Sequence, residues 1–511
     1  MEYKWKALSV TSVGTLMSAI DSVVVLLALV PIAEDLHADY VTIVWVVVAY
    51  LLANTSLVLT FGRLGDSFGR KRIYNLGFVV FTVGSLLSAL SRTGVQLVVF
   101  RAVQGVGAAM MVSNSLAIIS EAFPVNERGR ALGINSIVWS SGNILGIILG
   151  GLIITFTTWR WIFLINVPIG VFGTLWAYVT LKESKGPGLK ETFDVPAALL
   201  FTTGVLAIQL GVTLGLLRGW SDPYALLSLI AAPPLLLGFA LWELYGARDP
   251  IFDLRLFRYS RMFSASIFTA TVQSLAMFAV NFLLLFYLEG IFGLPVLTAS
   301  YLIIPMAVVN MVSGPIGGRL TDKLGPRPVA TAGLVIQGVA LYLLATMSVN
   351  TPLWWVAFVE GLYGLGGGLF WPSNTTAVMS SAPRERYGSA SGLLTTFRNT
   401  GMVLSFAVAL TAVSAALPAS YVYQLFIGTL SSHLPFNLEV SYLNAQAFAY
   451  HVSLGLLALA TVLSALRPSG TLVRHAPPLR AKGYGSTLGG TTQAPLTDIT
   501  ARSELRQGEP K

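Results

Sequence analysis

The stretch Gly62-Arg63-Leu64-Gly65-Asp66-Ser67-Phe68-Gly69 decides the fold, because a near copy follows later as Gly318-Arg319-Leu320-Thr321-Asp322-Lys323-Leu324-Gly325. The offset is 318 − 62 = 256 residues, and the same offset aligns Val103-Gln104-Gly105 with Val359-Glu360-Gly361. Two separate motifs at one fixed offset indicate an internal duplication. We therefore expect two related halves.

Long apolar runs surround both copies. Of the 511 residues, 54% are hydrophobic and only 11% are charged, whereas a soluble domain carries about 25% charged residues. A membrane-spanning helix needs about 20 mostly apolar residues. Fourteen runs meet this need: 7–30, 41–61, 73–91, 95–120, 131–157, 162–181, 195–217, 223–244, 263–288, 296–317, 328–348, 352–378, 388–414 and 447–466. The predicted fold class is an all-α polytopic membrane protein.

The repeat also fixes how these helices are grouped. It aligns the second and third runs with the tenth and eleventh, and the fourth with the twelfth, which is a shift of eight helices. The chain is therefore predicted to hold two pseudo-symmetric six-helix bundles with two inserted helices between them. The predicted parts are an N-terminal bundle at 1–181, the inserted pair with its linker at 182–262, a C-terminal bundle at 263–466 and a disordered cytoplasmic tail at 467–511.

Basic residues in the loops predict the orientation, since cytoplasmic loops carry an excess of Lys and Arg. With the N-terminus inside, 27 of the 32 basic residues fall in inside segments, and Arg92, Arg160 and Arg218 fall outside. Both termini are therefore expected in the cytoplasm. The net charge of +9 follows from this topology and requires no nucleic-acid partner. The longest external loop is predicted at 415–446.

Asp21, Arg101, Glu360 and Arg398 are charged residues within the predicted helices. Charges inside a membrane are costly and usually face a cavity or a partner. A desolvated carboxyl group can exchange a proton near neutral pH. Asp21 and Glu360 are thus candidates for proton coupling, with Arg398 as a possible partner of Glu360. A structural role in hydrogen bonding is the alternative for both acids.

Residues 62–72 closely resemble the signature loop of the major facilitator superfamily, Gly-x-Leu-x-Asp-x-x-Gly-Arg-Lys/Arg. The sequence alone suggests a tight cytoplasmic turn between two helices. The resemblance implies that Gly62, Asp66, Gly69 and Arg70 help latch the two halves at the cytoplasmic side. In the second copy Gly318, Asp322 and Gly325 are matched, but Pro326 replaces the arginine.

Two further motifs are similar to those of drug:proton exporters in that superfamily. The predicted helix 95–120 has Leu97, Arg101 and Gln104-Gly105. The resemblance associates the arginine with proton transfer. The predicted helix 131–157 has Gly142, Gly146, Gly150 and Gly151 at the spacing of the antiporter motif, but Ile147 takes the place of proline. A plain helix-packing face is the alternative there. The order Trp159-Arg160-Trp161 to Gly170 and the helix count resemble the fourteen-helix branch over residues 10–466.

Other chemistry finds little support in the sequence. There is no cysteine, the four histidines are scattered, and no nucleotide-binding loop or nucleophile–base set occurs. No enzyme activity, metal or cofactor is expected. Polar residues within the helices are candidates to line a substrate cavity: Asn54, Gln104, Asn114, Asn143, Asn281, Asn310 and Asn374.

The leading hypothesis is a monomeric transporter of the cell membrane that exports amphipathic or cationic compounds, driven by the proton gradient. A symporter or facilitator for a specific nutrient or organic acid on the same fold is the first alternative. A non-transporting sensor or scaffold is the second, and it would not need the intramembrane charges.

Overall fold

A computed structural model describes residues 2–184, 193–247, 250–252, 254, 256–277, 280–294, 296–418, 421 and 435–468. The chain divides into the units Met1–Ala476 and Pro477–Lys511, and the second lies outside the described residues. So does the predicted disordered tail at 467–511, apart from Arg467 and Pro468.

The first six predicted spans are all helical. Their principal elements are α1 Tyr3–Leu27, α3 Tyr40–Phe68, α4 Arg70–Ala89, α5 Gly94–Ala122, α6 Arg128–Phe156 and α8 Asn166–Thr180. Short elements join them, namely α2 Leu29–Asp35, the 3₁₀ turn Val125–Glu127 and α7 Trp161–Leu164. Side chains set two of the helix starts: Asp39 caps α3 by accepting the Thr42 N–H, and Thr93 caps α5 by accepting the Gln96 N–H, both at 3.3 Å.

The inserted pair forms a helical hairpin, α9 Val195–Arg218 and α10 Pro223–Leu241, and α10 continues as a π-helical turn, Trp242–Gly246. Each helix has proline in its first turn and an aspartate at its N-cap. Asp194 accepts the Ala197 N–H at 3.0 Å, and Asp222 accepts the Ala225 N–H at 3.0 Å.

The last six predicted spans are also helical. Their elements are α12 Arg261–Met277, α13 Val280–Gly290, α14 Val296–Tyr301, α15 Ile304–Leu324, α16 Pro326–Ala345, α17 Leu353–Ser381, α18 Tyr387–Ala416 and α20 Phe436–Ala465. Two short elements, α11 Leu256–Tyr259 and the 3₁₀ turn Arg384–Arg386, precede α12 and α18.

Thirteen helical segments of the described chain are long and apolar enough to cross a membrane. The tenth predicted span, 296–317, is not among them. This span contains α14 and most of the 21-residue α15. The hydropathy of α15 is lowered by Asn310, Ser313, proline and several glycines. The tenth predicted span is therefore helical but more polar than the other thirteen, and the count of fourteen stays a prediction.

Two predicted boundaries are wrong. Residues 62–68 do not form a turn, because α3 continues to Phe68 and the chain reverses at Gly69 alone. The second copy behaves alike, with α15 ending at Leu324 and the reversal at Gly325. The external loop predicted at 415–446 is shorter, since α20 begins at Phe436, eleven residues before the predicted start at 447. The polar residues of that helical extension hid it from a search for apolar runs.

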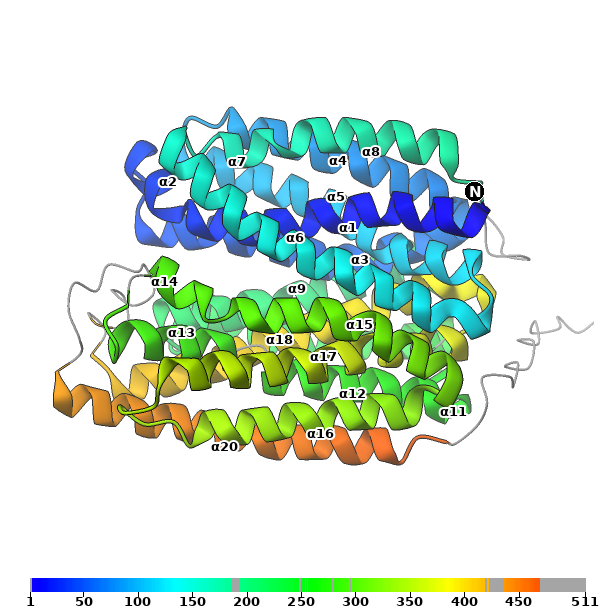
Figure 1. Ribbon diagram of the computed structural model, residues 1–511. Coiled ribbons are helices and arrows are strands. Elements are labelled where there is room, and N and C mark those ends of the chain that lie inside the picture. The colour runs from blue at the N-terminus through cyan, green and yellow to red at the C-terminus, as the bar shows by residue number, and fades with distance from the viewer. Residues whose placement is uncertain are drawn as a thin grey trace, which may run out of the picture. The chain divides into compact units, whose positions relative to one another are not determined.

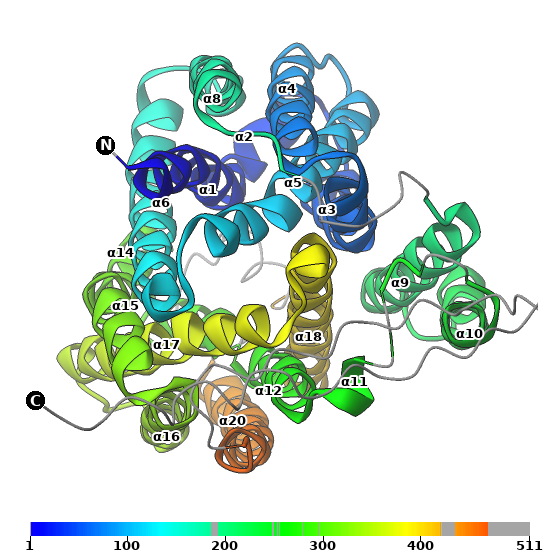
Figure 2. The ribbon, with the colours of Figure 1, turned by 90° about the vertical axis from the view of Figure 1, so that its right-hand side faces the viewer.

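Helices from the two ends of the chain pack side by side (Figure 1). α6 packs against α15, and α3 packs against α18. Figure 2 shows the inserted pair beside α3 and α18, with α9 closer to both than α10 is. The division into 1–181, 182–262 and 263–466 stays a prediction. Following the predicted orientation, we call the end that carries Gly69 and Gly325 cytoplasmic.

Candidate functional site

Asp21 lies at the centre of a buried polar network among α1, α5 and α8. Its Oδ2 forms an ion pair with Arg101 Nη1 at 2.8 Å, and both side chains are almost fully buried. Its Oδ1 accepts hydrogen bonds from Gln104 Nε2 at 2.9 Å and from Asn166 Nδ2 at 3.1 Å. Since both carboxylate oxygens have charged or amide donors, the ionised form of Asp21 is well solvated by protein groups.

The surroundings of Arg101 fix its position. Its Nε donates to the Val46 carbonyl at 3.2 Å, and its Nη1 also donates to Gln104 Oε1 at 2.6 Å. The guanidinium lies 4.4 Å from the ring centre of Tyr50 and 5.7 Å from that of Phe163. Arg101 therefore faces the interior of the bundle and does not extend toward the outer membrane surface.

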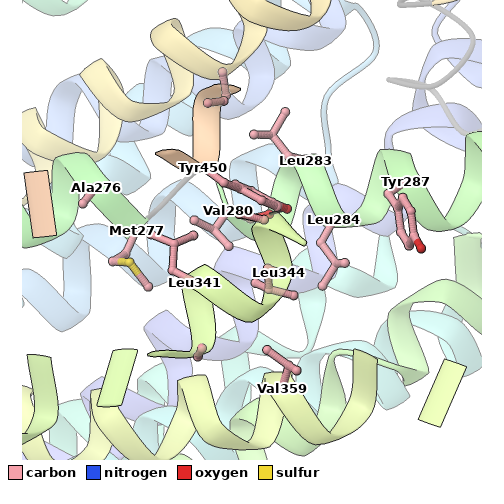
Figure 3. Close-up of a cluster of buried hydrophobic side chains, with 14 of the residues drawn as sticks. Ala276, Met277, Val280, Leu283, Leu284, Tyr287, Leu341, Leu344, Val359 and Tyr450 are labelled. Atoms are coloured by element: carbon pink, nitrogen blue, oxygen red, sulfur yellow. Dashed lines mark hydrogen bonds between the residues drawn. The ribbon is translucent and has the colours of Figure 1, made fainter. Parts of the chain in front are cut away.

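The second half carries a different arrangement at the same repeat positions. The 256-residue offset relates Gln104 to Glu360, Asp21 to Met277 and Arg101 to Ala357. Only the first of these equivalents is polar, so the second half has an acid but no counterpart of the ion pair. Figure 3 shows Met277 among buried apolar side chains together with Val359, the residue before Glu360.

Glu360 is fully buried, and neither of its carboxyl oxygens has a hydrogen-bond partner in the described part of the chain. Tyr363 and Tyr450 lie within electrostatic range, but their hydroxyls are used elsewhere. Tyr363 donates to the Met277 carbonyl at 3.3 Å, and Tyr450 donates to the Val280 carbonyl at 3.2 Å. An isolated buried carboxylate is very costly, so this group is expected to be a neutral acid in this conformation.

The expected pairing of Glu360 with Arg398 is not found among the ion pairs of the described residues. Arg398 Nε instead donates to Asn399 Oδ1 at 3.4 Å, and its guanidinium lies 5.6 Å from the ring centre of Trp371. The neighbouring Asn399 reaches Thr55 Oγ1 of α3 at 3.1 Å. Arg398 lies about 16 Å along α18 from the start of the helix, at 1.5 Å per residue. The contact of Asn399 with Thr55 places this part of α18 beside the first half.

Asp66 joins the cytoplasmic end of α3 to the start of α18. Its two oxygens accept the backbone N–H groups of Gly388 and Ser389, each at 2.8 Å, and Oδ2 also accepts the Ser389 hydroxyl at 2.9 Å. A carboxylate suits the N-terminus of a helix, where backbone N–H groups lack partners and the helix dipole is positive. Asp66 is completely buried.

Asp322 makes the same kind of contact in the opposite direction. It lies at the cytoplasmic end of α15 and accepts the N–H groups of Gly129 at 2.8 Å and Arg130 at 2.9 Å, at the start of α6. Both copies of the repeated motif therefore reach across to the other half. Asp322 is only half-buried.

Glycines permit the close approach of the backbones at both contacts. A Cβ atom added to Gly62 would lie 2.3 Å from the Gly388 carbonyl oxygen, and one added to Gly318 would lie 2.1 Å from that of Gly129. Gly69 and Gly325, which reverse the chain, have φ values of 117° and 85°, a region that side chains disfavour.

Arg70 strengthens the first contact only. It binds Asp66 Oδ1 through Nη2 at 2.9 Å and Glu121 Oε2 through Nη1 at 2.7 Å, and it donates to the Arg384 carbonyl at 2.8 Å. Pro326 stands at the equivalent place in the second copy and offers no such donor. The two contacts are therefore alike in geometry but unequal in charge.

Three glycines of α6 form a seam against α1. A Cβ atom at Gly142 would lie 2.5 Å from Ala19 Cβ, one at Gly146 would lie 3.0 Å from the Ile20 carbonyl oxygen, and one at Gly150 would lie 2.8 Å from Leu27 Cδ1. Gly151 has open space around it. The seam thus sets the position of the segment that carries Asp21.

We expect Gly142→Val to separate α1 from α6 and to lower stability by about 1–3 kcal/mol, because the added side chain overpacks a close backbone contact. Gly151→Val is the matched control, since the added atoms meet open space, and it should leave stability nearly unchanged. Thermal unfolding of the two variants in the same detergent measures this difference. Equal losses in both would show that the glycine spacing does not act through the contact with α1.

The seven polar cavity candidates have different environments. Gln104 belongs to the Asp21 network, and Asn114 is buried between α3 and α5, where its Nδ2 donates to the Phe61 carbonyl at 3.3 Å. Asn374 accepts a hydrogen bond from Arg467 Nη2 at 2.6 Å.

The other candidates lie elsewhere in the bundle. Asn310 accepts a hydrogen bond from Ser140 Oγ of α6 at 3.1 Å, and Asn281 donates one to Met306 Sδ at 3.1 Å. Asn54 and Asn143 are half-buried on α3 and α6. Asn310 links the two halves, so it remains the strongest candidate for a site between them.

Sequence reasoning missed several of these contacts. Asn166 was read only as part of a motif, although a polar residue at that depth is itself a signal. The partners of Asp66 and Asp322 form a second repeat: Pro124, Gly129 and Gly133 match Pro383, Gly388 and Gly392 at the constant offset 388 − 129 = 259. A search for this second offset would have found both helix starts.

Known proteins resemble this chain over most of its length. The riboflavin transporter RibZ of Clostridioides difficile (strain 630) is 33% identical over 83% of this chain and 90% of its own length. The tetracenomycin C resistance and export protein of Streptomyces glaucescens is 30% identical over 83% of this chain and 77% of its own length. The proton:xylose symporter XylE has the same fold, with a TM-score of 0.62, 15% identity and coverage of 90% of this chain and 94% of its own.

The membrane-spanning helices and these relatives place the chain in the cell membrane as a multi-pass protein. The family profile described as the Major Facilitator Superfamily matches residues 11–406. With the fold, this match and the relatives in agreement, the chain belongs to the Major Facilitator Superfamily and is a membrane transporter of that family.

Proposed function

We propose that the protein exports amphipathic, often cationic compounds in exchange for protons, without a cofactor, by alternating access to a site between its two six-helix halves. Glu360 carries this proposal, because it is a buried acid without a partner in the described residues. The relative named as a tetracenomycin C resistance and export protein supports export as the direction of transport.

Glu360 is the proton carrier in this scheme. Its surroundings favour the neutral acid, so it holds a proton in the conformation described above. When the conformational cycle brings water or a cationic substrate next to the carboxyl group, the ionised form is stabilised and the proton leaves. Proton and cation then compete for one carboxylate, and alternating exposure to the two sides converts this competition into exchange.

The first half contributes the buried charged pair Asp21 and Arg101, whereas the second half contributes the buried acid Glu360. In the conformation described above, the mutual pairing of Asp21 and Arg101 keeps the network neutral overall. The network adjoins the glycine seam between α1 and α6, so a relative movement of these helices would alter the ion pair. Asp66 and Asp322 act as the cytoplasmic latch and keep that side closed until both contacts are released.

The first test is substrate movement in proteoliposomes under an imposed proton gradient, using wild type and Glu360→Gln with a panel of amphipathic cations. We expect wild type to move substrate against its gradient and Glu360→Gln to lose this driven movement to background, because an amide cannot exchange the proton. Substrate exchange without a proton gradient should persist in the variant. Glu439→Gln, a half-buried acid near the start of α20, is the control. Undiminished driven transport by Glu360→Gln would remove the carrier role.

Arg398 favours a second candidate function, the uptake or facilitated passage of an organic acid or another specific nutrient. Its guanidinium lies deep within α18 without an acidic partner among the described ion pairs, and one relative is a riboflavin transporter. A cation in this position would attract an anionic group. The sign of the transported charge separates the two candidates: organic acids moved without amphipathic cations would favour the second.

A further inference from the structure

An apolar groove of about 990 Å³ lies among α9, α12, α18 and α20, outside the polar network and the latch. Its fourteen lining residues include no charged side chain, and twelve of them are apolar. The lining comes from the outer ends of the helices: Val212 lies near the end of α9, Ala416 ends α18, and Ser441 lies near the start of α20. The groove is therefore at the level of the outer membrane leaflet.

Small residues form part of the groove wall on α18 and α20. Ala407, Ala412 and Ala416 line it from α18, and Ala445 and Ala449 line it from α20. Small residues on membrane helices normally allow close packing of the backbones. Here they border a volume within the range of ligand pockets, about 300–1,000 Å³. Along these stretches of α18 and α20 the described residues leave an apolar groove open.

The inserted hairpin explains why this space exists. At its cytoplasmic end it shares a hydrophobic cluster with both halves, where Phe201 packs with Leu59 of α3 and Leu393 of α18. Thr202 also hydrogen-bonds Thr60 of α3 at 3.1 Å. At its outer end Val212 and Trp220 line the groove. Protein contacts thus hold the cytoplasmic end of the hairpin, and the groove lies beside its outer end.

A cation lies close in the chain to a residue that lines the groove. Arg218 ends α9 two residues before Trp220, and it is exposed with no ion pair among the described residues. It is also one of only three basic residues in the predicted outer loops. Trp220 itself is 46% exposed, and tryptophan is typical of the membrane–water interface. A cation above an apolar groove matches a phosphate group above an acyl chain.

We propose that this groove binds a phospholipid of the outer leaflet, with one acyl chain between α9 and the alanine faces and its phosphate at Arg218. The lipid fills the space between the outer end of the inserted hairpin and the C-terminal half. It joins the hairpin to α18 and α20 where protein contacts do not. The proposal is independent of the transported substrate.

The test is native mass spectrometry of the full-length, delipidated protein titrated with palmitoyl-oleoyl phosphatidylglycerol. We expect wild type to bind one molecule at the highest affinity. Ala445→Phe, which fills the groove, should weaken this binding about tenfold, equivalent to about 1.4 kcal/mol. Arg218→Gln, which leaves the packing intact, should weaken it about fivefold. Val335→Phe on a lipid-facing part of α16 and Arg92→Gln in another outer loop are the controls and should bind like wild type.

The remaining outcomes decide against the proposal. If Ala445→Phe is folded, with unchanged thermal unfolding, and binds the lipid as tightly as wild type, the groove is not the site. If glycerol phosphate binds as tightly as the lipid, the acyl chain contributes nothing and the site is a surface phosphate site. If Ala445→Phe lowers the binding of rhodamine 6G but not of the phospholipid, the groove takes an amphipathic cation instead.

Discussion

Asp66→Ala is expected to open the cytoplasmic latch and to abolish transport. The substitution leaves Arg70 in a buried position with one fewer carboxylate, and it removes the acceptor of the Gly388 and Ser389 N–H groups. Removing one partner of a buried, hydrogen-bonded ion pair costs about 3–5 kcal/mol. The loss falls on the conformation in which the halves meet at the cytoplasmic end, so the equilibrium should shift toward the opened state.

Spin labels can measure this shift directly, because the chain has no cysteine of its own. Cysteines introduced at Arg72 of α4 and Lys323 of α15 place one label on each half at exposed cytoplasmic positions. Asp66→Ala should add a population with a longer distance between the labels. Asp222→Ala is the control, since Asp222 also caps a helix through two backbone N–H groups, at the outer end of the inserted hairpin. An unchanged distance distribution in Asp66→Ala would contradict the latch.

The two latches should not be equal in strength. Asp322 is half-buried, accepts two backbone N–H groups and has no arginine at the position of Arg70. Losing hydrogen bonds of this kind costs about 1–3 kcal/mol. Asp322→Ala in the same spin-labelled protein therefore serves as a graded comparison, with a smaller long-distance population than Asp66→Ala.

The sequence predicted those parts of the fold that depend on short local patterns. Apolar runs found the spans, and the repeat at Gly62 and Gly318 matches a pair of equivalent helix ends. The turn predicted at 62–72 is too long, because glycine and charge normally mark loops, whereas here most of these residues lie on the last turns of α3, as their equivalents do on α15. Gly62 and Gly318 allow two helices from different parts of the chain to approach closely. The local sequence around one glycine does not show which helix it will contact.

Partners across the fold were harder to predict than the residues themselves. Asp21 and Arg101 were identified by their cost inside a membrane and Gln104 by its motif, but their mutual contact requires the packing of α1 against α5. The same reasoning paired Glu360 with Arg398 because both are charged and deep. Among the described residues that pairing is not found, and Arg398 lies beside Trp371 and Asn399. Charge complementarity suggests candidate pairs, and only helix packing decides among them.

The second large effect is expected from breaking the ion pair of Asp21 and Arg101, which should lower the stability of the protein. Asp21→Ala should lower stability by about 3–5 kcal/mol, because Arg101 is then a buried cation without a counter-charge. Arg101→Ala should cost less, since Gln104 and Asn166 still donate to Asp21. The double variant Asp21→Ala, Arg101→Ala should be more stable than Asp21→Ala alone, because neither charge is left unpaired. Thermal unfolding of all four proteins gives the coupling between the two sites.

Transport by the double variant then separates a structural pair from a functional one. If the two charges act only on each other, restored stability should bring restored transport. If the pair changes during the proton cycle, as we propose, the double variant should be stable but should show no movement driven by the proton gradient. Gln104→Leu is the control, because it perturbs the network without removing a charge. Stable folding with full driven transport in the double variant would leave Glu360 as the proton carrier and reduce the Asp21–Arg101 pair to a packing element.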